Sequence, residues 1–143
     1  MNMNKYFIIF FACFLLILPV FGGNIENNKD FGRFLAALEK VESGGRADAF
    51  NKKEVAVGIY QIRPAYFKDA QEYDKTLSKY KHLDCYDKNI SKRVVIAYMN
   101  RYCKTNSFET WAKSHNGGPG WNDKTGEAKN NLAIYYKKIM IFL

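Results

Sequence analysis

In the stretch "LEKVESGGRADAF", residues 38–50, an apolar helical pattern runs into a glutamate, a serine and two glycines. Before these glycines, apolar residues recur at steps of three and four: Phe31, Phe34, Leu35, Leu38 and Val41. This spacing predicts an amphipathic helix over about residues 28–43, and Gly44 and Gly45 are typical helix-ending residues. Residues 46–58 are polar and then β-branched, which predicts a long loop or a small β-hairpin.

The rest of the pattern is also mostly helical. Pro64 stands where a helix can begin, and Asp87 or Ser91 begins the next helix, through "KRVVIAYMNRYC". Ser107 caps a short helix in "SFETWAKSH", and a last helix is expected over about residues 126–141. No repeat or long linker divides the chain. We therefore expect one mostly α domain (α+β at most), with about five helices and a short excursion after the first.

The first 22 residues have the pattern of a signal peptide. Lys5 precedes an uncharged apolar run, "YFIIFFACFLLILPVFG", which ends at small residues. We predict cleavage near Gly22, a mature domain over residues 23–143 and a periplasmic or extracellular location. An uncleaved anchor helix is the alternative, and a lipoprotein attached through Cys13 is less favoured. After removal of the leader we expect no stable membrane insertion.

The charge is strongly basic, with 22 Lys and Arg against 14 Asp and Glu. Such an excess favours an anionic partner, which can be nucleic acid, a membrane surface or an acidic wall polymer. For an exported chain the wall polymer is the most natural of the three, so no nucleic-acid partner is expected. We also expect a monomer.

The cysteines predict a disulfide. Loss of the leader leaves Cys85 and Cys103, and two thiols in an exported domain usually pair. A metal site built from these cysteines with His82 and His115 matches no zinc spacing, so neither a metal nor a cofactor is expected.

Glu42 is the first candidate for chemistry. With about 100° per residue and Phe31 at zero, Glu42 falls at roughly 20°, inside the apolar stripe, whereas Lys40 falls on the opposite face. A carboxyl directed at an apolar wall tends to stay protonated, which is what the acid of a glycosidase requires. The alternative is that Glu42, near the helix end, bends to solvent or pairs with Arg46.

Four segments occur in a recognisable order: "VESGG" (41–45), "VGIYQIRP" (57–64), "SHNGGPG" (114–120) and "AIYYKKI" (133–139). Together they resemble the lysozyme-like superfamily, in particular the soluble lytic transglycosylase family and the related goose-type lysozymes. The resemblance implies a lysozyme-like domain. It also implies cleavage of the β-1,4 bond between N-acetylmuramic acid and N-acetylglucosamine in peptidoglycan glycan strands.

The resemblance also implies roles for the first two segments. Glu42 matches the single catalytic acid and base, and Ser43 matches the serine beside it that contacts the substrate or the acid. Gly58 allows a tight turn, Gln61 faces the cleft and Ile62 packs under it.

In the later segments, Asn116 matches an asparagine whose amide bonds sugar or supports the acid, and Tyr135 matches a tyrosine that lines the cleft. Taken alone, Asn116 can be a turn former, Gln61 a helix-entry residue and Tyr135 a core residue. His115 departs from the family, which usually has tyrosine there, and Asn131 replaces a frequent glutamate. The expected substrate-binding residues are Ser43, Gln61, Ile62, His115, Asn116 and Tyr135.

Two reactions share this acid. A hydrolase usually needs a second carboxylate to position water, and Asp48 and Glu54 are the candidates, although Glu54 lies in a charged run typical of solvated residues. A lytic transglycosylase needs none, because the sugar's 6-hydroxyl attacks the anomeric carbon and forms a 1,6-anhydro product. We favour the transglycosylase over a goose-type hydrolase. A non-catalytic wall-binding module and a membrane-active basic protein are weaker alternatives.

Overall fold

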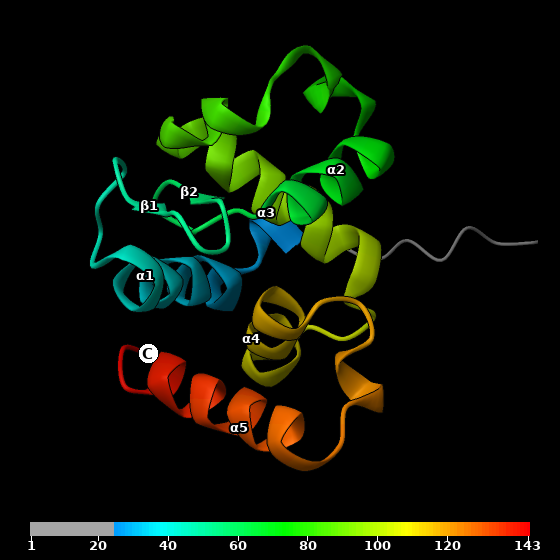
Figure 1. Ribbon diagram of the computed structural model, residues 1–143. Helices are drawn as coiled ribbons and strands as arrows, with labels where there is room; N and C mark the ends of the chain where they lie inside the picture. Colours follow the sequence, from blue (N-terminus) through cyan, green and yellow to red (C-terminus); the bar gives the residue numbers. More distant parts are fainter. Residues whose placement is uncertain (1–24) are drawn as a thin grey trace, which may run out of the picture.

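The computed structural model describes residues 25–143, so the predicted signal peptide lies outside the described residues. The expectation of a mostly α domain is confirmed by five α-helices and one small antiparallel sheet in this part of the chain. Within the same residues, no helix combines the length and apolar character needed to cross a bilayer. In chain order (Figure 1) the elements are η1 (Ile25–Asn27), α1 (Lys29–Ser43), β1 (Phe50–Asn51), β2 (Ala56–Val57), α2 (Pro64–Tyr73), η2 (Lys75–Lys79), η3 (His82–Tyr86), α3 (Lys88–Tyr102), α4 (Phe108–Gly117), η4 (Trp121–Asp123) and α5 (Gly126–Met140).

The helix ends follow the local signals. The Asn28 side chain accepts hydrogen bonds from two N–H groups of the first turn of α1, and Asp87 does the same for α3. Ser107 accepts from the N–H of Thr110 and so caps α4. At the other end of α1, Gly44 has a left-handed φ of 65°, a conformation that glycine adopts without steric cost. These caps explain why the predicted helix limits were close.

The core gathers around the apolar face of α1. Phe31 and Phe34 are buried, and the Trp111 ring of α4 lies 5.1 and 5.6 Å from their ring centroids. On the other side, α2 packs on α3 through Tyr66 and Tyr98, whose rings stack at 3.5 Å. Helix α5 packs on both α4 and α1, beneath them in the view of Figure 1. Thus α1, α4 and α5 form one packed group to which the last turn of α1 belongs.

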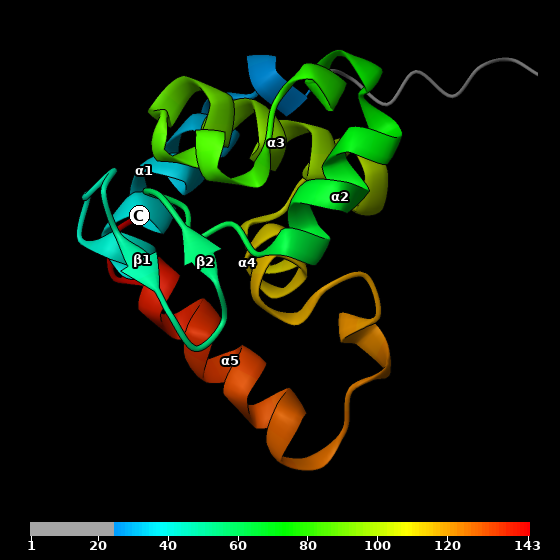
Figure 2. The ribbon, with the colours of Figure 1, turned by 45° about the horizontal axis from the view of Figure 1, so that its top comes forward.

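The hairpin after α1 leads into α2 (Figure 2). Its two strands pair with Phe50 opposite Val57, and Val57 also bridges to Ile62. Gly58 turns the chain with a φ of 77°, and a Cβ added there would lie 2.0 Å from the carbonyl oxygen of Cys85. The glycine is therefore required both by its backbone angle and by the contact with η3.

The predicted disulfide between Cys85 and Cys103 is wrong, because both thiols are free. Cys85 lies in η3 just before α3, and Cys103 directly follows the 15 residues of α3. A helix of this length separates its ends by roughly 22 Å, whereas bridged Cα atoms lie within about 7 Å. Instead, the Cys103 thiol lies 3.4 Å from the Met99 sulfur, and burial raises the pKa of Cys85 to about 12.

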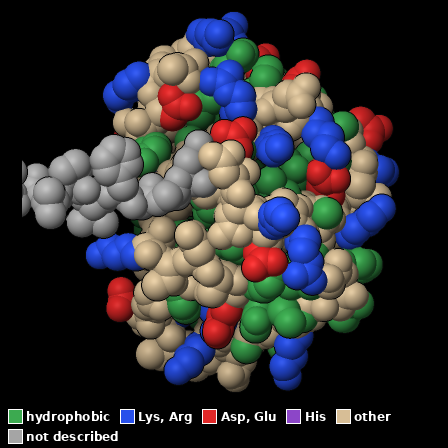
Figure 3. Space-filling view, turned by 180° about the vertical axis from the view of Figure 1, so that it is seen from behind, with side chains coloured by type: hydrophobic (Ala, Val, Ile, Leu, Met, Phe, Trp, Pro, Cys, Tyr) green, Lys and Arg blue, Asp and Glu red, His purple; other side chains and the backbone are tan. Residues whose placement is uncertain are grey.

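The positive charge is distributed over the face of the molecule that Figure 3 shows. On the face shown in Figure 3, Lys and Arg side chains alternate with Asp, Glu and apolar groups, with no continuous basic stripe on this face. The basic excess therefore acts there as a general attraction for anions.

Candidate active site

Glu42, in the last turn of α1, is directed inward as the helical projection predicts. Its side chain is 17% exposed, and the Tyr135 hydroxyl of α5 donates a hydrogen bond to its Oε1. Burial raises the pKa of Glu42 from 4.5 to about 7, while the Tyr135 hydrogen bond and the charge of Arg63 act in the opposite direction. The predicted alternative of a pair with Arg46 is not formed, since that guanidinium donates to the carbonyl oxygen of Ser43.

The carboxyl opens into a small cavity of about 100 Å³. Four of the predicted site residues lie on its wall, although they come from the end of α1, the loop before α2 and the end of α4. Tertiary packing therefore unites segments that the sequence separates by more than fifty residues. The lining residues are Glu42, Asn51, Glu54, Gln61, Arg63, His115 and Asn116.

Gln61 and Ser43 hold the hairpin against α1. Gln61 has a φ of 48°, and its side-chain amide donates to the carbonyl oxygens of Gly58 (2.9 Å) and Ala49 (3.3 Å). The Ser43 hydroxyl lies 2.9 Å from the carbonyl oxygen of Ile59, to which it donates. A left-handed non-glycine residue stores strain, and such strain is frequent at functional sites. Both side chains thus fix the backbone that forms the cavity wall.

Neither Ile62 nor Tyr135 is among the residues that line this cavity, and both are buried next to it. Ile62 is fully buried beneath the loop, and Tyr135 is 9% exposed. The sequence did not indicate that the Tyr135 hydroxyl bonds directly to Glu42.

His115 is buried in the wall, with only 4% of the residue exposed. Its Nε2 lies 3.1 Å from the carbonyl oxygen of Tyr60, which can only accept, so we assign the proton to Nε2. Nδ1 then accepts a hydrogen bond from the Tyr66 hydroxyl at 3.2 Å. Burial lowers the pKa of His115 to about 3, so the ring stays neutral near neutral pH. Nε2 also lies 3.7 Å from Oε1 of Glu42, beyond hydrogen-bond length.

Arg63 is a site residue that sequence reasoning missed. Its Nη2 donates to the carbonyl oxygens of His115 (2.9 Å) and Asn116 (3.2 Å), which ties the start of α2 to the end of α4. Asn116 itself is exposed at the cavity mouth. The only signal for Arg63 was its place between Ile62 and Pro64, which indicated a helix start rather than a charge in the cavity.

The site contains no arrangement suited to metal binding. Within residues 25–143 no three His, Cys, Asp or Glu side chains lie close enough to hold an ion. The groups available for chemistry are the Glu42 carboxyl with its bound Tyr135 hydroxyl, the exposed Glu54 carboxylate, the Arg63 guanidinium and nearby amides.

This mostly helical domain, in which the half-buried Glu42 carboxyl opens into a small polar cavity, has a lysozyme-like fold. The family model of the transglycosylase SLT domain matches residues 21–137. The chain therefore belongs to this family of lytic transglycosylases, whose substrate is peptidoglycan. A search of curated proteins gave no match.

Proposed function

We propose that the protein is exported and cleaves the β-1,4 bond between N-acetylmuramic acid and N-acetylglucosamine with Glu42 as its one catalytic acid and base. The observation that carries this proposal is the buried Glu42 carboxyl, whose pKa of about 7 leaves it partly protonated near neutral pH. A general acid works best when its pKa lies near the working pH.

In the first step, protonated Glu42 donates its proton to the glycosidic oxygen as the bond to the anomeric carbon breaks. The resulting carboxylate accepts a hydrogen bond from Tyr135, which stabilises the charge. In the second step the carboxylate takes the proton of the sugar's 6-hydroxyl while that oxygen bonds to the anomeric carbon. The acid is thereby restored and a 1,6-anhydro-muramyl end is formed.

The other expected residues then have supporting roles. Asn116 and Gln61 line the cavity; Asn116 offers its amide to sugar hydroxyls, and Gln61, whose N–H groups bind Gly58 and Ala49, offers its Oε1 as an acceptor. Ser43 and Ile62 hold the loop, while neutral His115 closes the wall beside the acid.

One observation favours hydrolysis as a second candidate reaction. Glu54, in the hairpin, lines the same cavity as Glu42, and its charge contributes to the raised pKa of Glu42. A second carboxylate facing the acid across a cavity can position water. Glu54 is nevertheless exposed and lies in a run of charged residues, as expected of a solvated side chain. We therefore prefer the transglycosylase.

The proposed cellular location is based on the substrate and on the predicted signal peptide. We propose that residues 1–22 direct export and that residues 23–143 act as a monomer on the wall, in the periplasm or outside the cell. The basic charge favours retention on the acidic wall polymer.

The test compares the wild-type protein with Glu42→Gln on purified peptidoglycan. We expect release of soluble muropeptides to fall by about 10²-fold or more, the usual size of a general acid's contribution. A wild-type protein that binds the wall without releasing muropeptides would instead indicate a wall-binding module.

A further inference from the structure

A second cavity adjoins the one that holds Glu42. Its volume is about 250 Å³, and it shares Arg63 and Asn116 with the first cavity. It lies between the start of α2 and the segment after α4, so a strand bound at Glu42 has this space beside it. Its lining residues are Arg63, Ala65, Tyr66, Asp69, Tyr98, Asn116, Gly117, Gly118, Pro119 and Lys124.

Among the described residues, neither cation of this cavity, Arg63 or Lys124, forms an ion pair, although the charge of Arg63 also acts on the nearby Glu42. Nη2 of Arg63 is used by two carbonyl oxygens, but within residues 25–143 no hydrogen-bond acceptor reaches its Nη1 or Nε. Lys124 forms no ion pair with any residue of the same range. The one carboxylate on the wall, Asp69, lies 4.0 Å from the Arg101 guanidinium and is thus already compensated. The cavity therefore has a positive excess and unused donors.

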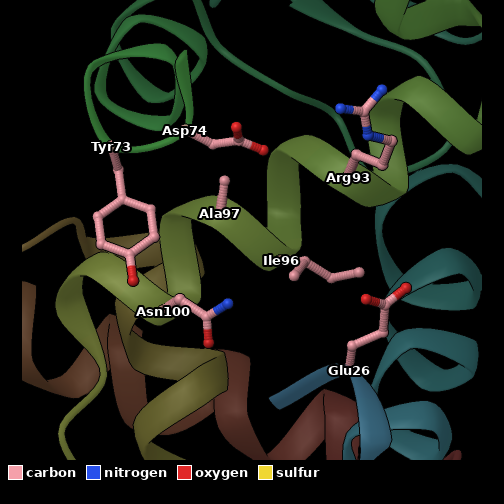
Figure 4. Close-up of a pocket in the computed structure, with 7 residues that line it drawn as sticks. All are labelled: Glu26, Tyr73, Asp74, Arg93, Ile96, Ala97 and Asn100. Atoms are coloured by element: carbon pink, nitrogen blue, oxygen red, sulfur yellow. The ribbon is translucent and has the colours of Figure 1, made fainter. Parts of the chain in front are cut away.

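A different cavity of about the same volume provides the contrast (Figure 4). It lies beside α3, and its arginine, Arg93, donates from Nη1 to the Tyr80 hydroxyl (3.3 Å) and from Nη2 to Thr76 Oγ1 (2.8 Å). Asp74 accepts from the same threonine. Both Nη atoms of Arg93 therefore bind protein groups, whereas no group within residues 25–143 binds Nη1 of Arg63.

We propose that Arg63 and Lys124 form a carboxylate-binding subsite that holds the acidic substituent of the muramyl residue next to the scissile bond. Guanidinium groups bind carboxylates through strong charge-assisted hydrogen bonds, and the second cation adds to the attraction. Arg63 is thus a specificity-determining residue, which makes the enzyme distinguish charged strands from neutral ones. This inference rests on the proposed function.

The carboxylate has two sources in peptidoglycan. Strands that carry stem peptides present the carboxylates of those peptides. Strands stripped by an amidase present the carboxylate of the lactyl group itself. N-acetylglucosamine carries neither, so recognition of this group also fixes which of the two sugars lies beside the acid.

The experiment measures binding of strands to full-length protein in the Glu42→Gln background, which leaves the strands uncut. Three substrates are compared: stem-bearing strands, amidase-stripped strands, and stripped strands whose carboxyls are converted to neutral amides. We expect one of the two carboxylate-bearing strands to bind about tenfold or more tightly than the neutral strand. Tighter binding of stem-bearing strands identifies the peptide carboxylates as the group bound, and tighter binding of stripped strands identifies the lactyl carboxylate. Adding Arg63→Gln should abolish this preference, and Lys124→Gln should reduce it.

Two further variants separate recognition from structure. Arg93→Gln, in the cavity of Figure 4, should keep the preference, and Arg63→Lys should keep part of it because the charge remains. If Arg63→Gln weakened the binding of all three strands equally, the inference would be overturned. Arg63 would then act only through its hydrogen bonds to the carbonyl oxygens of His115 and Asn116. Cleavage of the strands by Glu42→Gln would instead overturn the proposed catalytic role of Glu42. Cleavage is detected from the released products, independently of the ratio of affinities, so the two failures can be distinguished.

Discussion

Glu42 is subject to two opposing influences, burial against apolar neighbours and a hydrogen bond from Tyr135. Its inward direction was predictable, because the position depends only on the helical period of the residues before it. The hydrogen bond was not, because Tyr135 lies 93 residues further along the chain and reaches Glu42 only through the packing of α5 on α1. The role of Arg63 was hidden for the same reason.

Glu42→Gln should stabilise the protein at alkaline pH. The pKa of Glu42 is about 7 in the folded state and near 4.5 when unfolded. Between these two pH values the carboxyl is therefore protonated in the folded state and ionised in the unfolded state. Wild-type stability from this group is therefore full below about pH 4.5 and is lost as the pH rises through about 7. By urea denaturation, the variant should exceed wild type by about 2–3 kcal/mol at about pH 8 and match it at about pH 4. A difference independent of pH would contradict the raised pKa.

Tyr135→Phe should move the pH dependence of cleavage. The hydroxyl favours the ionised carboxyl, so its loss raises the pKa of Glu42 above about 7. The acid then stays protonated to higher pH, and the alkaline limb of the kcat/KM profile should shift upward by roughly one pH unit. Tyr136→Phe, on the same helix, is the control, since its hydroxyl has no hydrogen bond to Glu42. An unmoved limb in Tyr135→Phe would argue against the contact.

At the scale of elements, local signals predicted the helices and the hairpin well. Asn28, Asp87 and Ser107 are the N-caps found in the structure, and Gly44 ends α1. Interactions between distant elements were not predictable in this way. The disulfide prediction rested on the number of cysteines and the expected oxidising compartment, whereas the helix that the sequence also predicts between Cys85 and Cys103 holds the two thiols apart.

The hairpin turn depends on a contact of this distant kind. Gly58→Ala combines a left-handed φ of 77° with a Cβ 2.0 Å from the Cys85 carbonyl oxygen, whereas Gly44→Ala has a similar φ and open space. We expect Gly44→Ala to cost about 1 kcal/mol of unfolding free energy and Gly58→Ala at least about 2 kcal/mol more. Chemical denaturation of both variants measures this. Equal losses of unfolding free energy in the two variants would mean that the Cys85 carbonyl in η3 moves away from the added Cβ at little energetic cost.

At the scale of the whole molecule, family membership and fold agree with what the four sequence segments imply. Packing of α1, α4 and α5 and of the hairpin brings three of these segments to one cavity and the fourth, through Tyr135, to the acid. The order of the four segments can be read directly from the sequence, and for this reason it indicated the family before the structure was known. Glu54 was already a candidate from the sequence, but only the assembled fold shows that Glu54 and Arg63 both lie on the cavity wall.

The most direct test of the one-carboxyl reaction is the fate of water. Peptidoglycan is digested by the wild-type protein in water labelled with heavy oxygen, and the products are weighed by mass spectrometry. Attack by the sugar's own hydroxyl predicts 1,6-anhydro-muramyl ends that carry no label. Reducing muramyl ends that carry the label, and that disappear in Glu54→Gln, would contradict it and assign water positioning to Glu54.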